Sequence, residues 1–222
     1  MKILLLETSS KNCSVAISDG EKLLCVCEEV SENYKQSESL HTFVEWALEG
    51  AEISMNDLDA VSLGKGPGSY TGLRIGAASA KGFCYGLKIP LIAVNSLETM
   101  IEPFLGQNYD YIIPLIDARR MEVYCAVFDG NSGVMISDTE AKILDENSFQ
   151  DFEEKKILFV GDGATKAKEI ISVSDAEYHS NIYPSAKYLV KPSLEKFNKK
   201  EFEDVAYFEP FYLKDFHGVK KK

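Results

Sequence analysis

The first thirty residues alternate between apolar runs and turn residues in a pattern that predicts strands. Residues 2–7 are apolar at successive positions, which is typical of a strand buried on both faces in the middle of a sheet. Residues 13–18 and 22–28 are also strand-like, and Asp19-Gly20 between them is a strong β-hairpin signal. The chain is therefore expected to open with a central strand followed by a hairpin.

A helical period comes next. Apolar residues recur three and four positions apart between residues 37 and 48, and Gly50 marks the end of the predicted helix. Trp46, the only tryptophan, lies off this apolar stripe, so it either packs against a neighbouring loop or belongs to a binding surface. The stripe itself consists of Leu40, Phe43, Val44, Ala47 and Leu48.

Residues 60–90 predict a strand, a rigid glycine turn and a long helix from about residue 71 to residue 87. The turn combines glycines, which permit close backbone approach, with a proline and with hydroxyl side chains that can cap the helix. It matches neither the Walker motif, the dinucleotide fingerprint nor the nucleophile elbow. It is therefore either a tight connector or a cradle for an anion. Its residues are Gly64, Gly66, Pro67, Gly68, Ser69, Thr71, Gly72 and Arg74.

The long helix has two faces suited to packing. One is an apolar stripe made of Leu73, Ala77, Ala80, Phe83, Cys84 and Leu87. The opposite face is mostly small and consists of Ile75, Ala78, Ser79, Gly82 and Gly86. One face should meet the chain's own sheet; the other should meet either another helix of this chain or a helix of a partner protein. A cation in the first helical turn is unfavourable by about 0.3–1 kcal/mol, so Arg74 is expected to have an acidic partner or a function.

The pattern of the first half begins again near residue 111. Strand 2–7 ends in Glu7, and Asp19-Gly20 starts twelve residues later; strand 111–116 is followed by Asp117, and Asp129-Gly130 starts twelve residues after it. A later strand, 157–160, again runs into a glycine turn and a helix. We interpret this as an internal duplication, with lobes at residues 1–108 and 109–222.

Charge and composition limit the possible functions. The net charge is −11, and the only basic block is 220–222, so a role on nucleic acid requires another component to supply most phosphate contacts. Five cysteines without paired spacing predict reduced thiols, and three dispersed histidines (41, 179 and 217) do not predict a metal site. The N-terminal apolar run is too short for a signal peptide, no stretch could span a membrane, and we expect a cytoplasmic protein.

Two halves that each open with an acid-tipped strand and a hairpin resemble the duplicated α/β fold of actin, sugar kinases and heat-shock chaperones (ASKHA). That resemblance implies two lobes, each with a mixed, five-stranded type of sheet and helices. More narrowly, GKGPGSYTGLRIGAASAKGF, IPLIAVNSLE, PLIDARRMEVYCAVFD, VGDGA and YPSAKYL resemble the TsaB (YeaZ) family of bacteria over nearly the whole chain.

The resemblance implies a non-catalytic paralogue and partner of TsaD, the enzyme that transfers a threonylcarbamoyl group to the adenosine beside the anticodon of certain tRNAs, with the ATPase TsaE completing the set. It implies no cofactor, and tRNA contact only within the complex. It also implies a heterodimer with TsaD through the N-terminal helices, and a self-dimer is expected without the partner. The implied partner-binding residues are Leu40, Phe43, Val44, Ala47, Leu73, Ala77, Ala80, Phe83 and Cys84.

Several residues argue against catalysis. Phosphate-gripping hairpins need glycine in the turn, but the turns here are Thr8-Ser9-Ser10 and Ala118-Arg119-Arg120. Catalytic relatives carry two metal-binding histidines one helical turn apart, whereas the first helix here offers only Gln36 and His41. The family usually begins with Asp-Thr-Ser, and this chain has glutamate at residue 7. A nucleotide-dependent phosphotransferase and a metallopeptidase are the alternative functions.

Overall fold

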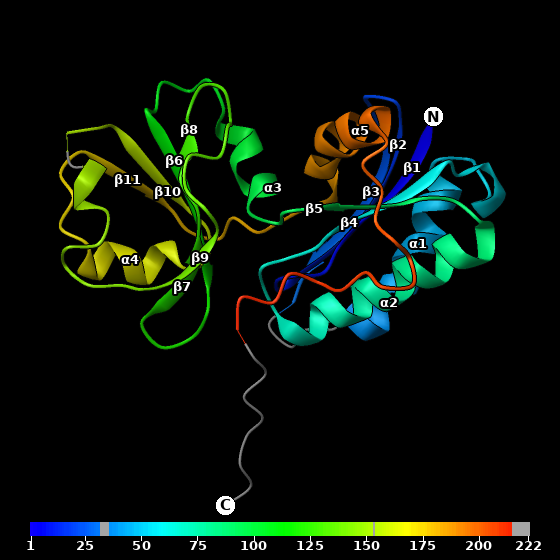
Figure 1. Ribbon diagram of the computed structural model, residues 1–222, viewed down its shortest axis with the longest axis horizontal. Coiled ribbons are helices and arrows are strands. Elements are labelled where there is room, and N and C mark those ends of the chain that lie inside the picture. Colours follow the sequence, from blue (N-terminus) through cyan, green and yellow to red (C-terminus); the bar gives the residue numbers. More distant parts are fainter. Residues whose placement is uncertain (32–35, 153, 215–222) are drawn as a thin grey trace, which may run out of the picture.

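The computed structural model describes residues 1–31, 36–152 and 154–214; for residues 36–38 it describes the backbone. The chain forms two lobes, each built on one sheet (Figure 1). In the first sheet the strand order is β3-β2-β1-β4-β5, so β1 is central, as its apolar run predicts. The strands are β1 (Lys2–Glu7), β2 (Asn12–Asp19), β3 (Lys22–Val30), β4 (Ala60–Gly64) and β5 (Leu91–Val94).

Two long helices cover one face of the first sheet. They are α1 (Gln36–Gly50) and α2 (Tyr70–Leu87), close to the predicted boundaries. Between α1 and β4 the 3₁₀ helix η1 (Met55–Asp57) is capped by Ser54, whose amide and hydroxyl donate to the Asp57 carboxylate at 2.8 and 2.7 Å. The glycine turn, residues 64–69, joins β4 to α2.

The second sheet repeats the topology of the first. Its order is β11-β10-β6-β7-β9, with β8 also paired to β6, so a central strand is again flanked by an antiparallel hairpin and a parallel strand. The duplication predicted from the sequence is confirmed. Its elements are β6 (Tyr111–Asp117), β7 (Glu122–Cys125), β8 (Phe128–Asp129), β9 (Glu140–Ile143), η3 (Gln150–Phe152), β10 (Ile157–Val160), α4 (Ala164–Ile170) and β11 (Ala176–His179).

Each lobe covers the remaining face of the other lobe's sheet. The elements after β5, α3 (Glu98–Ile101) and η2 (Glu102–Phe104), pack on the second sheet against buried residues of β6 and β10. The elements after β11, η4 (Ala186–Leu189) and α5 (Val190–Lys199), pack on the first sheet (Figure 1). The predicted lobes, 1–108 and 109–222, therefore exchange helices, because the last helix of each half finds its apolar surface on the opposite sheet.

The end of the described chain returns along α2. Lys81 of α2 donates from its ammonium group to the carbonyls of Ala206 and Phe208 at 3.0 and 3.1 Å. The Phe211 amide donates to the Lys65 carbonyl at 2.8 Å. Residues 205–213 form no helix or strand. None of the described helices is both long enough and apolar enough to cross a membrane.

Candidate functional site

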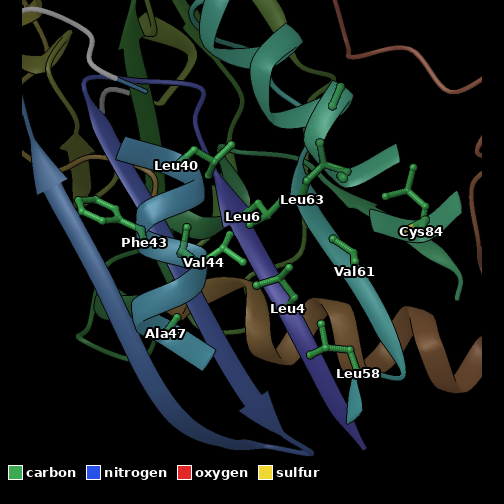
Figure 2. Packing of buried hydrophobic residues seen from close by; sticks show 14 of the residues in the cluster. Leu4, Leu6, Leu40, Phe43, Val44, Ala47, Leu58, Val61, Leu63 and Cys84 are labelled. Carbon is green, nitrogen blue, oxygen red and sulfur yellow. The ribbon is translucent and has the colours of Figure 1, made fainter. Parts of the chain in front are cut away.

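The apolar stripes of α1 and α2 face the chain's own core. Figure 2 shows Leu40 and Val44 of the α1 stripe directed toward β1, where Leu4 and Leu6 lie, and Phe43 and Ala47 belong to the same buried cluster. Contact between these helices and a partner protein stays a prediction. Because the side chains predicted for that contact already pack inside the lobe, we expect a partner to contact the exposed faces of α1 and α2. Buried are Leu40, Phe43, Val44, Ala47, Leu73, Ala77, Ala80 and Cys84, and Phe83 is half-buried against the same core.

The opposite face of α2 is open. Ala78, Gly82 and Gly86 are exposed at spacings of four residues, so they form one ridge of small residues along the helix. A Cβ atom added at Gly82 or Gly86 would meet nothing within 4 Å. Tyr85 beside this ridge is 85% exposed. Of the small-residue face predicted from the sequence, Ile75 packs against the core and Ser79 lies beside His41 of α1, whereas Ala78, Gly82 and Gly86 are exposed.

The adjoining surface of α1 carries two ring side chains. His41 is exposed; its Nε2 lies 3.3 Å from the Ser79 hydroxyl, and its ring packs edge-on against Phe83 with centroids 6.0 Å apart. Trp46 is 55% exposed and touches Phe43, with ring centroids 5.7 Å apart. Of the two roles predicted for Trp46, this exposure favours the binding surface.

The glycine turn and the start of α2 pack closely against the β1–β2 turn, residues 8–11. A Cβ atom on Gly68 would overlap the Ser9 carbonyl, and one on Gly72 would overlap the Thr8 carbonyl. The Ser69 amide donates to the Ser9 carbonyl at 2.6 Å, and the Thr8 hydroxyl donates to the Gly72 carbonyl at 2.8 Å. This geometry favours the tight-connector interpretation of the motif.

Glu7 lies at the centre of this contact. Its carboxylate is fully buried, and Oε1 accepts a hydrogen bond from the Ser9 amide at 2.8 Å. Oε2 has no hydrogen-bond partner among the described residues and fills the space where a side chain at Gly64 would be. Burial raises the pKa of the Glu7 carboxyl, although the Ser9 amide and the nearby hydroxyls of Ser9 and Ser96 act in the opposite direction.

The N-terminus of α2 carries a half-buried aromatic ring, Tyr70, beside an exposed cation, Arg74. The Ser69 hydroxyl accepts a hydrogen bond from the Gly72 amide at 3.4 Å, and the Arg74 guanidinium lies 5.2 Å from the centroid of the Tyr70 ring. Within the described residues Arg74 forms no ion pair, so its neighbour is aromatic and not the expected acid. A shallow groove of about 450 Å³ is lined by Tyr70, Thr71, Arg74, Ile75 and Ala78.

The equivalent turn of the second lobe is polar and open. The Asp117 carboxylate accepts from the Arg119 amide at 2.7 Å and from the Lys166 ammonium at 2.6 Å. Asp162, in the second glycine turn, accepts from the Asp117 amide at 2.8 Å. Burial raises the pKa of Asp162, and the nearby Lys11 of the first lobe acts against that rise. The charge of Lys11, in the β1–β2 turn, therefore acts on a carboxyl group beside the equivalent turn of the second lobe.

Metal and thiol chemistry find no support in the described residues. No three His, Cys, Asp or Glu side chains among them lie close enough to hold an ion. All five cysteines are free, and burial raises the pKa of Cys13 and Cys125 to about 12 and that of Cys84 to about 11. These three thiols are poor nucleophiles at neutral pH. The side chain of Gln36, together with His217 and residues 220–222, lies outside the described part.

One structural cluster could not be found from sequence spacing. The Glu28 carboxylate of β3 accepts from the Ser185 hydroxyl at 2.5 Å and from the Lys187 ammonium at 2.9 Å. Asn12 and Ser14 of β2 complete the network by bonding to Glu28 at 3.3 and 3.1 Å. This network fastens the returning C-terminal segment to the first sheet, and Ser185 and Lys187 are more than 150 residues from Glu28 in sequence.

Comparisons with known proteins agree with this fold. Residues 26–216 match the family model of TsaD, tRNA N6-adenosine threonylcarbamoyltransferase. The tRNA threonylcarbamoyladenosine biosynthesis protein TsaB of Bacillus subtilis is 29% identical, over 96% of this chain and 94% of the relative. TsaB of Escherichia coli is 28% identical over 100% and 98% of the two chains.

Solved structures show the same architecture. YeaZ from Pseudomonas aeruginosa superposes with a TM-score of 0.82 at 23% identity, covering 96% of this chain and all of that chain. An activator of 2-hydroxyisocaproyl-CoA dehydratase from Clostridium difficile, with bound ADPNP, gives a TM-score of 0.51 at 10% identity. At these identities the likeness concerns the fold alone.

Proposed function

Because the chain belongs to the TsaD family, and within it to the TsaB (YeaZ) group, we propose that it is a non-catalytic subunit in the biosynthesis of tRNA threonylcarbamoyladenosine. In this proposal it pairs with a TsaD enzyme, TsaE joins through the complex, and tRNA is contacted only within the assembly. The names of the full-length relatives support a role in this biosynthesis. The non-catalytic role rests on the glycine turn.

The proposal depends on how the backbone N–H and C=O groups of the β1–β2 turn are oriented. A phosphate cradle needs backbone N–H groups pointing into an open space. Here the carbonyls of Thr8 and Ser9 point at the glycine turn, and the Ser9 amide is engaged by Glu7. Carbonyl oxygens repel an anion, and the glycines leave it no room. This arrangement disfavours the alternative of a nucleotide-dependent phosphotransferase.

The partner surface in this proposal is the open face of α2 with the neighbouring part of α1. A ridge of Ala78, Gly82 and Gly86 allows a partner helix to approach closely, because no side chain holds the backbones apart. Tyr85 at its edge supplies the exposed aromatic area typical of binding hot spots. Without TsaD the same face is expected to pair with a second copy of the chain, since exposed apolar surface favours association.

The decisive experiment is a reconstituted transfer reaction. Threonylcarbamoyl transfer to tRNA is measured with TsaD, TsaE and the adenylate donor, in the presence and absence of this chain. We expect transfer to be lost on omission and the chain alone to have no activity. Undiminished transfer without the chain would overturn the proposal, and calorimetry with millimolar ATP would then test the phosphotransferase alternative.

A further inference from the structure

The β1–β2 turn and the equivalent β6–β7 turn of the duplicated fold differ in how deeply they are buried. The β1–β2 turn is buried beneath the N-terminal end of α2, an 18-residue helix. The β6–β7 turn, residues 118–121, is not buried in this way, because the glycine turn before α4 packs on Leu115, further back along β6. Lys166 of α4 donates to the Arg120 carbonyl at 3.0 Å but does not cover the arginine side chains. Arg119, Arg120 and Met121 are consequently exposed at the tip.

The backbone holds this tip in one shape. The Ala118 amide donates to the Glu122 carbonyl at 3.0 Å, and the Glu122 amide donates to the Arg119 carbonyl at 3.2 Å. Arg119 and Arg120 have φ of +70° and +53°, a left-handed conformation in which glycine or asparagine is cheaper by roughly 1 kcal/mol per residue. The requirements of the turn therefore do not account for two consecutive arginines.

The charges around the tip leave these arginines uncompensated. Three carboxylates lie nearby and each has a lysine neighbour: Asp117 with Lys166, Glu122 with Lys214, and Asp162 with Lys11. Within the described residues, no carboxylate forms an ion pair with Arg119 or Arg120. Asp145, just beyond β9, is engaged by the Asn147 amide and the Ser148 hydroxyl. Five cations thus lie near four carboxylates, on a chain whose net charge is −11.

The choice of arginine is also selective. Only three of the 24 basic residues in the chain are arginines, and two of them stand at this tip. A guanidinium group is always charged at neutral pH and presents a planar fork of donors that fits a phosphate in a bidentate manner. A local excess of one positive charge is too small to hold a nucleic acid by itself, but two exposed arginines add to contacts supplied by a neighbouring protein.

From this we propose that the exposed β6–β7 turn contacts the phosphate backbone of tRNA through Arg119 and Arg120 when the chain is assembled with its enzyme partner. The inference rests on the proposed function, since that function brings tRNA to the complex. It adds a surface on the second lobe, whereas the partner face lies on α1 and α2 of the first.

The test measures tRNA binding to the reconstituted complex by fluorescence anisotropy between 50 and 200 mM salt. The variant Arg119→Asn/Arg120→Asn removes both charges and keeps residues that tolerate positive φ. Two lost phosphate contacts should lower the slope of log K against log salt by about 1.5, which makes binding about tenfold less salt-sensitive over this range. Arg119→Lys/Arg120→Lys should keep the slope. Lys199→Ala/Lys200→Asn, an exposed pair at the C-terminal end of α5 in which asparagine tolerates the positive φ of residue 200, should leave both slope and affinity unchanged.

Two outcomes would overturn the inference alone. In one, the asparagine variant binds tRNA with the wild-type slope. In the other, it binds TsaD more weakly in sedimentation experiments without tRNA, which would mean that the turn meets an acidic protein surface. The proposed function fails separately, when transfer does not depend on the chain at all, and the inference then fails with it.

Discussion

The side chain of Thr8 occupies the space directly beside Gly76. Its hydroxyl donates to the Gly72 carbonyl at 2.8 Å and lies where a Cβ atom on Gly76 would be. The β1–β2 turn and the first two turns of α2 therefore interlock, and the glycines on this side of the helix are present because any side chain would force the two apart. The glycines on the other side, Gly82 and Gly86, have no such neighbour.

This difference predicts opposite effects for one chemical change. Gly72→Ala would push a methyl group into the Thr8 carbonyl, and the shift needed to relieve the overlap should lower the free energy of unfolding by about 2–3 kcal/mol. Gly82→Ala should raise it by about 1 kcal/mol, because alanine favours the helix and meets no neighbour. Urea denaturation of both variants at neutral pH measures this; equal destabilisation would contradict the assigned roles.

A substitution on the exposed face of α2 should change binding to TsaD without changing the stability of the free chain. Gly82→Leu should fold as stably as the wild type, since the site is open in the free chain. It should weaken binding to TsaD at least tenfold, because the added side chain separates the two helices. Ile143→Glu changes an equally exposed apolar residue on the second lobe and is the matched control. Calorimetric titration with TsaD compares the two; normal binding by Gly82→Leu would exclude this face from the interface.

Glu7 predicts a loss of stability as pH rises. The pKa of its carboxyl is raised in the folded chain, so the folded state holds the proton more tightly than the unfolded state does. The contribution of Glu7 should therefore fall steadily above the ordinary value of 4.5 and level off once pH exceeds the raised pKa. Glu7→Gln should remove this dependence and become more stable relative to the wild type as pH rises. A constant difference in urea midpoints between pH 4.5 and 9 would contradict the assignment.

Glu28 predicts the opposite dependence. Burial raises the pKa of Glu28, but hydrogen bonds from Ser185, Lys187 and Asn12 outweigh it and the net pKa is lowered. The stabilisation is therefore present above the ordinary value of 4.5 and is lost as pH falls through the lowered pKa. Glu28→Gln should cost about 1–2 kcal/mol at neutral pH and approach the wild type in acid.

A second readout locates the effect of Glu28. Amide hydrogen exchange in η4 and α5 should become faster in Glu28→Gln, because this network fastens their N-terminal end to β2 and β3. Exchange in the second sheet should not change. Uniform acceleration throughout the chain would show that the substitution lowers global stability without a local role at this junction.

The sequence by itself determined the elements and their repetition, because periodicity and turn chemistry are local properties. The run 2–7, the Asp19-Gly20 hairpin, the glycine turn and the twelve-residue spacing predicted a central strand, a hairpin next to it and their repetition in the second half; the order of all the strands came from the structure. The small-residue face of α2 could also be predicted, since residues four apart, such as Ala78, Gly82 and Gly86, lie on one side of a helix.

Only the tertiary structure decided which surface each apolar stripe meets. Leu40 and its neighbours have the pattern of an interface helix, but the same pattern serves a core, and the nearest apolar surface was the chain's own sheet. The packing of α3 and α5 on the sheet of the opposite lobe could not be predicted either, because the order of elements in the sequence does not fix which sheet a helix covers. The exposure of the arginine turn depends on where α4 packs: its glycine turn lies against Leu115, and Lys166 is the α4 side chain that bonds to the Arg120 carbonyl. That is a relationship in space.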